Sequence, residues 1–310
     1  MAHFIKTLKK TALAASIASL ATVANATIVT SIKPLGFIAS SIADGVTDTE
    51  VLVPAGASPH DYSLKPSDIQ KLQGAELILW VGEDIDAFLD KTLRPMPFKK
   101  VLSIADFAEI GGLLEGEAHD HKHEHDHKHD HAHGHDHDHS TNWHVWYSPE
   151  ISKIVATRLA TRLTEAYPEK KEKIAQNLAE FNRTLAEQSE KIKQQLAPVK
   201  EKGFYVFHDA YSYFNNAYGL KQTGYFTINP LVAPGAKTLA KIKQEIKEHK
   251  VNCLFAEPQF TPKVIESLSK GTGVHVGRLD PMGDAVKLGV NSYANFLQYT
   301  ADSYFACLSK

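Results

Sequence analysis

Short apolar runs rich in β-branched residues alternate along the chain with segments of helical periodicity. The runs that predict strands in the first half are IVTSI (28–32), EVLVP (50–54), LILWV (77–81) and VLSI (101–104). The second half repeats this pattern with FYVFHDA (204–210), GYFTI (224–228), VNCLFAEP (251–258) and VHVGRLD (274–280). Helices are expected between the strands, one starting at Pro66 with Asp68 in its first turn, others at 236–250 and 290–307. Alternation of this kind predicts α/β units with mainly parallel strands.

One long helix is predicted between the two halves. From Ile174 to Leu196 apolar residues recur at helical spacing, Pro168 opens the segment, and the helix ends before Pro198. We therefore expect an α/β fold in which two lobes of mainly parallel sheet flanked by helices are joined by one long rigid linker helix. The expected division is an N-terminal lobe at 27–167, the linker helix at 168–197 and a C-terminal lobe at 198–310.

The first 26 residues have the pattern of a secretory signal peptide. Lys6, Lys9 and Lys10 precede an apolar stretch that ends in Ala24-Asn25-Ala26, a small-residue cleavage site. The alternative is a transmembrane anchor, but the stretch is broken by Ser and Thr and is shorter than the roughly 20 apolar residues that a span needs. The leader has no cysteine to carry a lipid. We expect a free periplasmic protein that is not inserted in the membrane.

Charge and cysteine content narrow the possible functions. Removal of the leader takes away three lysines and no acid, so the formal charge moves from −2 to −5, which argues against a nucleic-acid partner. The two cysteines, Cys253 and Cys307, lie in the last quarter of a chain expected to be exported, so we expect one disulfide. A thiolate metal site is the alternative, but such sites need closely spaced cysteines.

The segment 117–140 contains a histidine at every second position from His119 to His139, eleven of the 17 histidines in the chain. Imidazole binds Zn²⁺, Cu²⁺ and Ni²⁺, so the segment indicates metal binding. It has no apolar face with which to order itself, and we expect a disordered His-rich loop. Its interchangeable ligand sets predict several weak sites.

Three other histidines follow predicted strands or lie at their ends: His60, His144 and His208. Asp280 has the same kind of position. Ligands of open α/β sheets bind at the carboxyl ends of strands, and three histidines with a carboxylate or water form a tetrahedral zinc set. A structural histidine is the alternative for each. Glu257 ends another strand and is a candidate partner for a ligating imidazole, with a surface carboxylate as the alternative.

Aromatic residues flank two of these histidines. Trp143, Trp146 and Tyr147 surround His144 in the sequence, and Tyr205, Phe207, Tyr211 and Tyr213 surround His208. Such residues predict apolar walls that strengthen the interactions of a bound cation, and an ordinary core is the alternative.

Four motifs together resemble the metal-binding proteins of ABC importers for zinc and manganese. They are GASPHDYSLKPSDIQKLQGAELILWVG, NWHVWYSP, FHDAY and GRLDPMG, and the resemblance covers residues 27–310. It implies one metal in the cleft between two lobes, with His60, His144 and His208 as ligands and Asp280 or water in fourth place. Some relatives carry an acid where this chain has Pro59, which cannot bind metal. Manganese members generally place a carboxylate at the position of His208, so a third imidazole favours Zn²⁺.

The sequence therefore predicts a monomeric periplasmic protein that captures Zn²⁺ and delivers it to the membrane permease of an ABC zinc importer, without catalysis. One alternative is a zinc-dependent hydrolase, in which Glu257 is the one conceivable general base. Another is a metal buffer that acts through the His-rich segment.

Overall fold

The structure is a computed structural model that describes residues 27–116, 141–260 and 263–310. The predicted signal peptide and the His-rich segment lie outside the described residues.

The N-terminal lobe is built on a four-stranded parallel sheet with the order β2-β1-β3-β4. Its strands are β1 (Thr27–Thr30), β2 (Asp48–Val51), β3 (Leu77–Trp80) and β4 (Val101–Ser103). β3 is a continuous apolar run because it is buried on both faces. Its helices are α1 (Lys33–Ile42), α2 (Pro66–Gly74), α3 (Glu83–Asp86) and α4 (Asp90–Leu93). As predicted, α2 begins at Pro66, and the Asp68 carboxylate accepts the N–H of Lys65 at 2.9 Å.

The C-terminal lobe repeats this arrangement with a parallel sheet of order β10-β9-β7-β8. Its strands are β7 (Phe204–His208), β8 (Gly224–Thr227), β9 (Cys253–Ala256) and β10 (His275–Arg278). Its helices are α7 (Ser212–Tyr218), α8 (Ala236–Lys247), α9 (Lys263–Thr272) and α10 (Ser292–Leu308). In both lobes the first strand of the lobe pairs with the second and the third, so the two sheets have the same topology.

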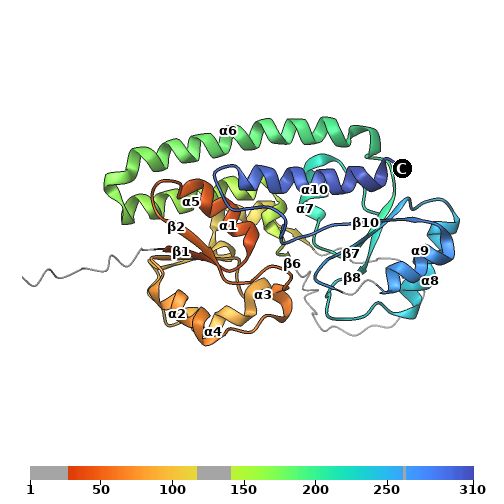
Figure 1. Cartoon of the computed structure of the whole chain (residues 1–310), viewed down its shortest axis with the longest axis horizontal. Coiled ribbons are helices and arrows are strands. Elements are labelled where there is room, and N and C mark those ends of the chain that lie inside the picture. The colour runs from red at the N-terminus through yellow and green to blue at the C-terminus, as the bar shows by residue number, and fades with distance from the viewer. Residues whose placement is uncertain (1–26, 117–140, 261–262) are drawn as a thin grey trace, which may run out of the picture.

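Helices α5 (Pro149–Ala166), α6 (Lys171–Leu196) and α10 connect the lobes. Figure 1 shows α6 running along one side of the molecule over both sheets, with α10 beneath it. The apolar face of α6 is buried, and one continuous cluster of buried side chains includes residues from both sheets and all three helices. A separate smaller core covers the opposite face of each sheet. The fold class predicted from the sequence is confirmed.

A disulfide and a short antiparallel strand pair join further parts of the chain. A disulfide joins Cys253 in β9 to Cys307 in α10, which confirms the predicted bond. The two-residue strands β5 (Glu115–Gly116) and β6 (Thr141–Asn142) pair antiparallel, so Gly116 lies opposite Thr141. No helix within 27–116, 141–260 and 263–310 is both long and apolar enough to cross a membrane.

Candidate metal centre

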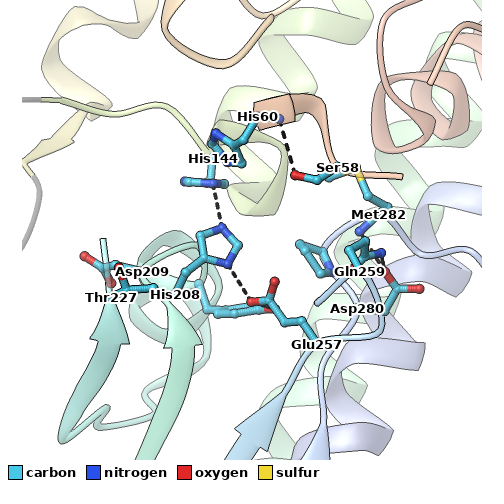
Figure 2. Close-up of polar contacts among 12 residues, drawn as sticks. Ser58, His60, His144, His208, Asp209, Thr227, Glu257, Gln259, Asp280 and Met282 are labelled. Carbon is cyan, nitrogen blue, oxygen red and sulfur yellow. Dashed lines mark hydrogen bonds and ion pairs between the residues drawn. The ribbon is translucent and has the colours of Figure 1, made fainter. Parts of the chain in front are cut away.

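Three imidazoles from separate parts of the chain meet between the lobes (Figure 2). His208 is the last residue of β7, and His60 lies in the 3₁₀ turn Pro59–Asp61 beyond β2. The Ser58 hydroxyl starts this turn by accepting the N–H of His60 at 3.3 Å. His144 lies two residues after β6. His208 and His144 are buried and His60 is half-buried.

The nitrogen atoms of the three rings are close enough to bind one ion. One ring nitrogen from each histidine lies within 4.8 Å of the other two. The Nε2 atoms of His208 and His144 are 3.2 Å apart. Two nitrogens that bind one tetrahedral Zn²⁺ at about 2.0 to 2.1 Å are separated by about 3.3 Å. The separation of this pair therefore fits one edge of a zinc tetrahedron.

Hydrogen bonds at Nδ1 leave Nε2 free for a cation in two of the rings. His208 donates from Nδ1 to Glu257 Oε1 at 2.6 Å, and Tyr211 donates its hydroxyl to the same oxygen at 2.8 Å. The Nδ1 of His144 lies 2.7 Å from the side-chain oxygen of Asn142. With hydrogens on Nδ1, the neutral rings point Nε2 lone pairs at each other, and such pairs repel unless a proton or metal cation lies between them.

Burial favours the neutral form of the His60 and His144 rings, which is the form that metals bind. Burial, followed by the charge of the neighbouring His208, lowers the pKa of His60 to about 4. Burial and then the charges of His208 and His60 hold the pKa of His144 well below its usual value. Protons consequently compete less with a metal for these two rings than they do for exposed imidazoles.

Glu257 adds negative charge beside the histidines. It is 2% exposed, and its Oε2 has no hydrogen-bond partner among the described residues. A buried carboxylate with an unsatisfied oxygen favours a cation nearby. The sequence reasoning identified Glu257 as a candidate partner of a ligand, and the structure places it against Nδ1 of His208.

Asp280 is buried close to this group but its carboxylate is engaged elsewhere. Oδ1 accepts from Gln259 at 2.7 Å and from the N–H of Met282 at 3.0 Å, and Oδ2 accepts the N–H of Asp284 at 2.7 Å. Figure 2 shows Asp280 on the far side of Gln259 from the histidines. Asp280 is not among the residues whose ligand atoms lie within 4.8 Å of one another, a comparison limited to the described residues.

The cavity between the rings is small. Its volume is about 10 Å³, close to the minimum for a single ordered water. Trp146 packs edge-on against His144 at 5.1 Å between ring centres, and Phe260 lies 6.4 Å from His208. Of the aromatics that the sequence predicted as walls, Trp146 lines the cavity, whereas Tyr205 belongs to the outer core of the C-terminal lobe. Phe260, the second aromatic of the lining, was not predicted.

The sequence reasoning did not identify Asn142, whose side-chain oxygen contacts both the backbone N–H and Nδ1 of His144. The signal was present two residues before His144, because an Asn side chain often accepts the N–H of the residue two positions later. The other two histidines among the described residues, His249 and His275, are exposed and lie outside the group.

The family and the sequence relatives that match this chain are described as zinc-uptake proteins. The family described as "ZnuA: Zinc-uptake complex component A periplasmic" matches residues 28–307. A Haemophilus influenzae protein named high-affinity zinc uptake system protein ZnuA is 64% identical, over 98% of this chain and 99% of its own. A Yersinia pestis protein of the same name is 46% identical, over 99% of this chain and 100% of its own.

The fold has counterparts among solved structures. A crystal structure of ZnuA aligns with a TM-score of 0.73 and covers 91% of this chain and 99% of its own at 24% identity. A likeness at this identity shows the fold alone. The sequence relatives carry the family assignment.

Proposed function

This chain belongs to the ZnuA family of periplasmic zinc-uptake components, and we propose that it captures Zn²⁺ between its two lobes and delivers it to the membrane permease of an ABC zinc importer. The observation that carries the proposal is the convergence of three imidazoles on one small buried cavity. Two of their Nε2 atoms are separated by one edge of a zinc tetrahedron.

We assign His60, His144 and His208 as the zinc ligands and Glu257 as the carboxylate that orients His208. Asp280 stays a prediction for the fourth place. To reach the ion it would have to give up hydrogen bonds from Met282 and Asp284, so water is its competitor there. Three nitrogen donors suit Zn²⁺, whereas an oxygen-rich octahedral set suits Mn²⁺.

A binding role is better supported than hydrolysis. A cavity of about 10 Å³ has room for an ion or a water and none for an ester or peptide. Oε1 of Glu257, the conceivable general base, is already occupied by hydrogen bonds from His208 and Tyr211. Assays of ester, peptide and lactam hydrolysis, with and without Zn²⁺, should show no turnover above that of a His208→Ala variant.

We also propose the oligomeric state, the lobe boundaries and the absence of a nucleic-acid partner. We propose a monomer that binds no nucleic acid, with lobes at 27–167 and 198–310 on either side of the helix at 168–197. The mature charge of −5 gives it no electrostatic attraction for nucleic acid. Sedimentation of the mature chain at several concentrations would test the monomer.

Calorimetric titration of metal-stripped residues 27–310 with Zn²⁺ and Mn²⁺ tests the central proposal. We expect one tight zinc site and weaker additional equivalents from the His-rich segment. A second form should replace residues 117–140 with Asn-Gly. Gly116 and Thr141 face each other in the β5–β6 pair, so a two-residue turn can join them. This form should keep the tight site and lose the weak equivalents. Loss of the tight site in it would favour the metal buffer instead.

A further inference from the structure

Asn142 connects one proposed ligand to the opposite lobe. It is the last residue of β6 and is 2% exposed. Its side-chain oxygen Oδ1 accepts the backbone N–H of His144 at 3.1 Å and lies 2.7 Å from Nδ1 of the same residue. Its Nδ2 donates to the carbonyl oxygen of Asp209 at 2.9 Å and to the Ser212 hydroxyl at 3.2 Å.

This network fixes which way the Asn142 amide points. The backbone N–H of His144 is a donor only, and the Asp209 carbonyl is an acceptor only, so the side-chain oxygen faces His144 and the NH₂ group faces Asp209. An amide oxygen cannot donate. The Nδ1 of His144 must therefore carry a hydrogen, which leaves the Nε2 lone pair facing the Nε2 of His208.

We propose that Asn142 is a positioning residue of the zinc site, which selects the Nδ1–H tautomer of His144 and holds its ring in the binding orientation. The inference rests on the proposed function, because it treats His144 as a ligand. Asn142 acts on His144 as Glu257 acts on His208, with a neutral amide in place of a carboxylate. A ligating imidazole usually has such a partner on its other nitrogen.

The same amide also links His144 to the segment that follows His208. Asp209 follows His208 directly, and Ser212 is the first residue of α7. Through one side chain His144 is thus tied to the residue next to His208 in the other lobe. The backbone of Asn142 is anchored as well, since Tyr213 donates its hydroxyl to the Asn142 carbonyl at 2.6 Å and accepts the N–H of Glu115 at 3.0 Å.

Two substitutions separate the acceptor from the rest of the side chain. Asn142→Asp keeps an oxygen toward His144 and loses the NH₂ group. Asn142→Leu has a similar volume and neither function. Asn177→Leu is the matched control, because Asn177 is also buried and donates to the carbonyls of Ile42 and Asp44, away from the metal centre.

Zinc affinity should be measured by competition with a chelator in the metal-stripped mature chain, together with melting temperature. We expect Asn142→Leu to weaken zinc binding roughly 10- to 100-fold, as loss of such a partner typically does. Asn142→Asp keeps the acceptor for Nδ1 of His144 but loses the donor to Asp209, so it should bind zinc more tightly than Asn142→Leu. Asn177→Leu should melt at a lower temperature with unchanged zinc affinity. Equal loss in Asn142→Asp and Asn142→Leu would overturn the proposal.

Nitrogen-15 NMR of the imidazoles in the metal-stripped wild type measures the tautomer of His144 directly. This measurement needs neither zinc nor a variant that folds correctly. We expect His144 as the Nδ1–H tautomer. A neutral His144 ring with its hydrogen on Nε2 and none on Nδ1 would overturn the proposal. A failure of the proposed function would look different from a failure of this inference. In that case His144→Ala would bind zinc as tightly as the wild type, while NMR would still show the Nδ1–H tautomer of His144 in the wild type.

Discussion

The two lobes share a sheet topology but place different chemistry at equivalent positions. Thr30 pairs with Leu79 in the first sheet as Val206 pairs with Phe255 in the second. Two residues beyond these pairs, Ile32 has the position in the first sheet that His208 has in the second. In the same way, Val81 has the position of Glu257. Ile32 and Val81 are fully buried apolar residues. The C-terminal lobe therefore has a proposed ligand at the end of β7 and its carboxylate partner directly after β9, at positions where the N-terminal lobe has core.

The N-terminal lobe supplies its histidines from loops and uses its buried carboxylate differently. Asp86 is fully buried in α3, and its Oδ2 accepts the Ser31 hydroxyl at 2.7 Å and the Val81 N–H at 2.9 Å. This carboxylate ties two strand ends together, whereas Glu257 accepts a hydrogen bond from His208, a proposed metal ligand. The comparison teaches that one topology can serve as a scaffold in one lobe and as part of a metal site in the other.

The largest expected effect comes from the ligands themselves. His208→Ala should weaken zinc binding on the order of 1,000-fold, more than the roughly 10- to 100-fold typical of an outer partner. His144→Ala and His60→Ala should also weaken it strongly, with His60→Ala the mildest because that side chain is half-buried. Chelator competition gives the affinities, and exposed His249→Ala and His275→Ala are the controls. Equal effects across all five variants would contradict the assignment.

Reduction of the disulfide should affect stability but not zinc binding. The bond fixes β9 of the C-terminal sheet to α10 across a sequence separation of 54. Closing a loop of this size contributes about 2 to 4 kcal/mol to the free energy of unfolding. We expect a lower melting temperature in reductant, with zinc affinity within about twofold of the oxidised protein. A chain with both cysteines replaced by serine should not respond to reductant. A large fall in zinc affinity on reduction would mean that β9 needs the disulfide to hold Glu257 in place.

The two buried carboxylates provide a direct test of the comparison between lobes. Glu257→Gln removes the charge beside His208 and should weaken zinc binding roughly 10- to 100-fold. Asp86→Asn changes a carboxylate of similar burial whose hydrogen bonds go to Ser31 and Val81 instead of a histidine, and should leave zinc affinity unchanged. Chelator competition on both variants decides the point. If Asp86→Asn weakened binding as much as Glu257→Gln, the division of roles between the lobes would be wrong.

The smallest effect is a pH dependence of stability in the N-terminal lobe. Burial raises the pKa of Asp86 to about 7, against the opposing effect of the hydrogen bonds from Ser31 and Val81. Between roughly pH 4.5 and 6.5 the folded chain keeps a proton that the unfolded chain releases. The stability of the metal-stripped wild type should therefore fall relative to Asp86→Asn by about 1 kcal/mol per pH unit as pH rises. Urea unfolding at several pH values measures this, with Asp302→Asn as the exposed control that should follow the wild type.

Much of this architecture was predictable because local patterns determine it. Buried parallel strands must be apolar runs, and the apolar spacing of α6 matches one buried helix face. The position of His208 at the end of β7 follows from the same strand pattern. The disulfide was predictable because the chain has two cysteines in an exported context.

Other features depend on contacts between distant parts of the chain. Asp280 has the sequence position of a ligand, but its carboxylate caps the backbone of Met282 and Asp284. The use of Asn142 depends on the carbonyl of Asp209, 67 residues away, which fixes the direction of its amide. That Val81 and Glu257 occupy equivalent positions becomes clear only when the strand pairing of the two sheets is compared.

The apolar core shared by both sheets has a consequence for unfolding. The cluster includes Ile28 and Leu79 from one sheet, Val206 and Phe255 from the other, and the buried face of α6 between them. Neither lobe can expose its part of this cluster without exposing the rest. The lobes therefore form one cooperative unit, and calorimetry should show a single transition. An ion bound at their junction raises the melting temperature of the entire molecule in proportion to the logarithm of its free concentration above Kd, so thermal denaturation of either lobe reports zinc occupancy.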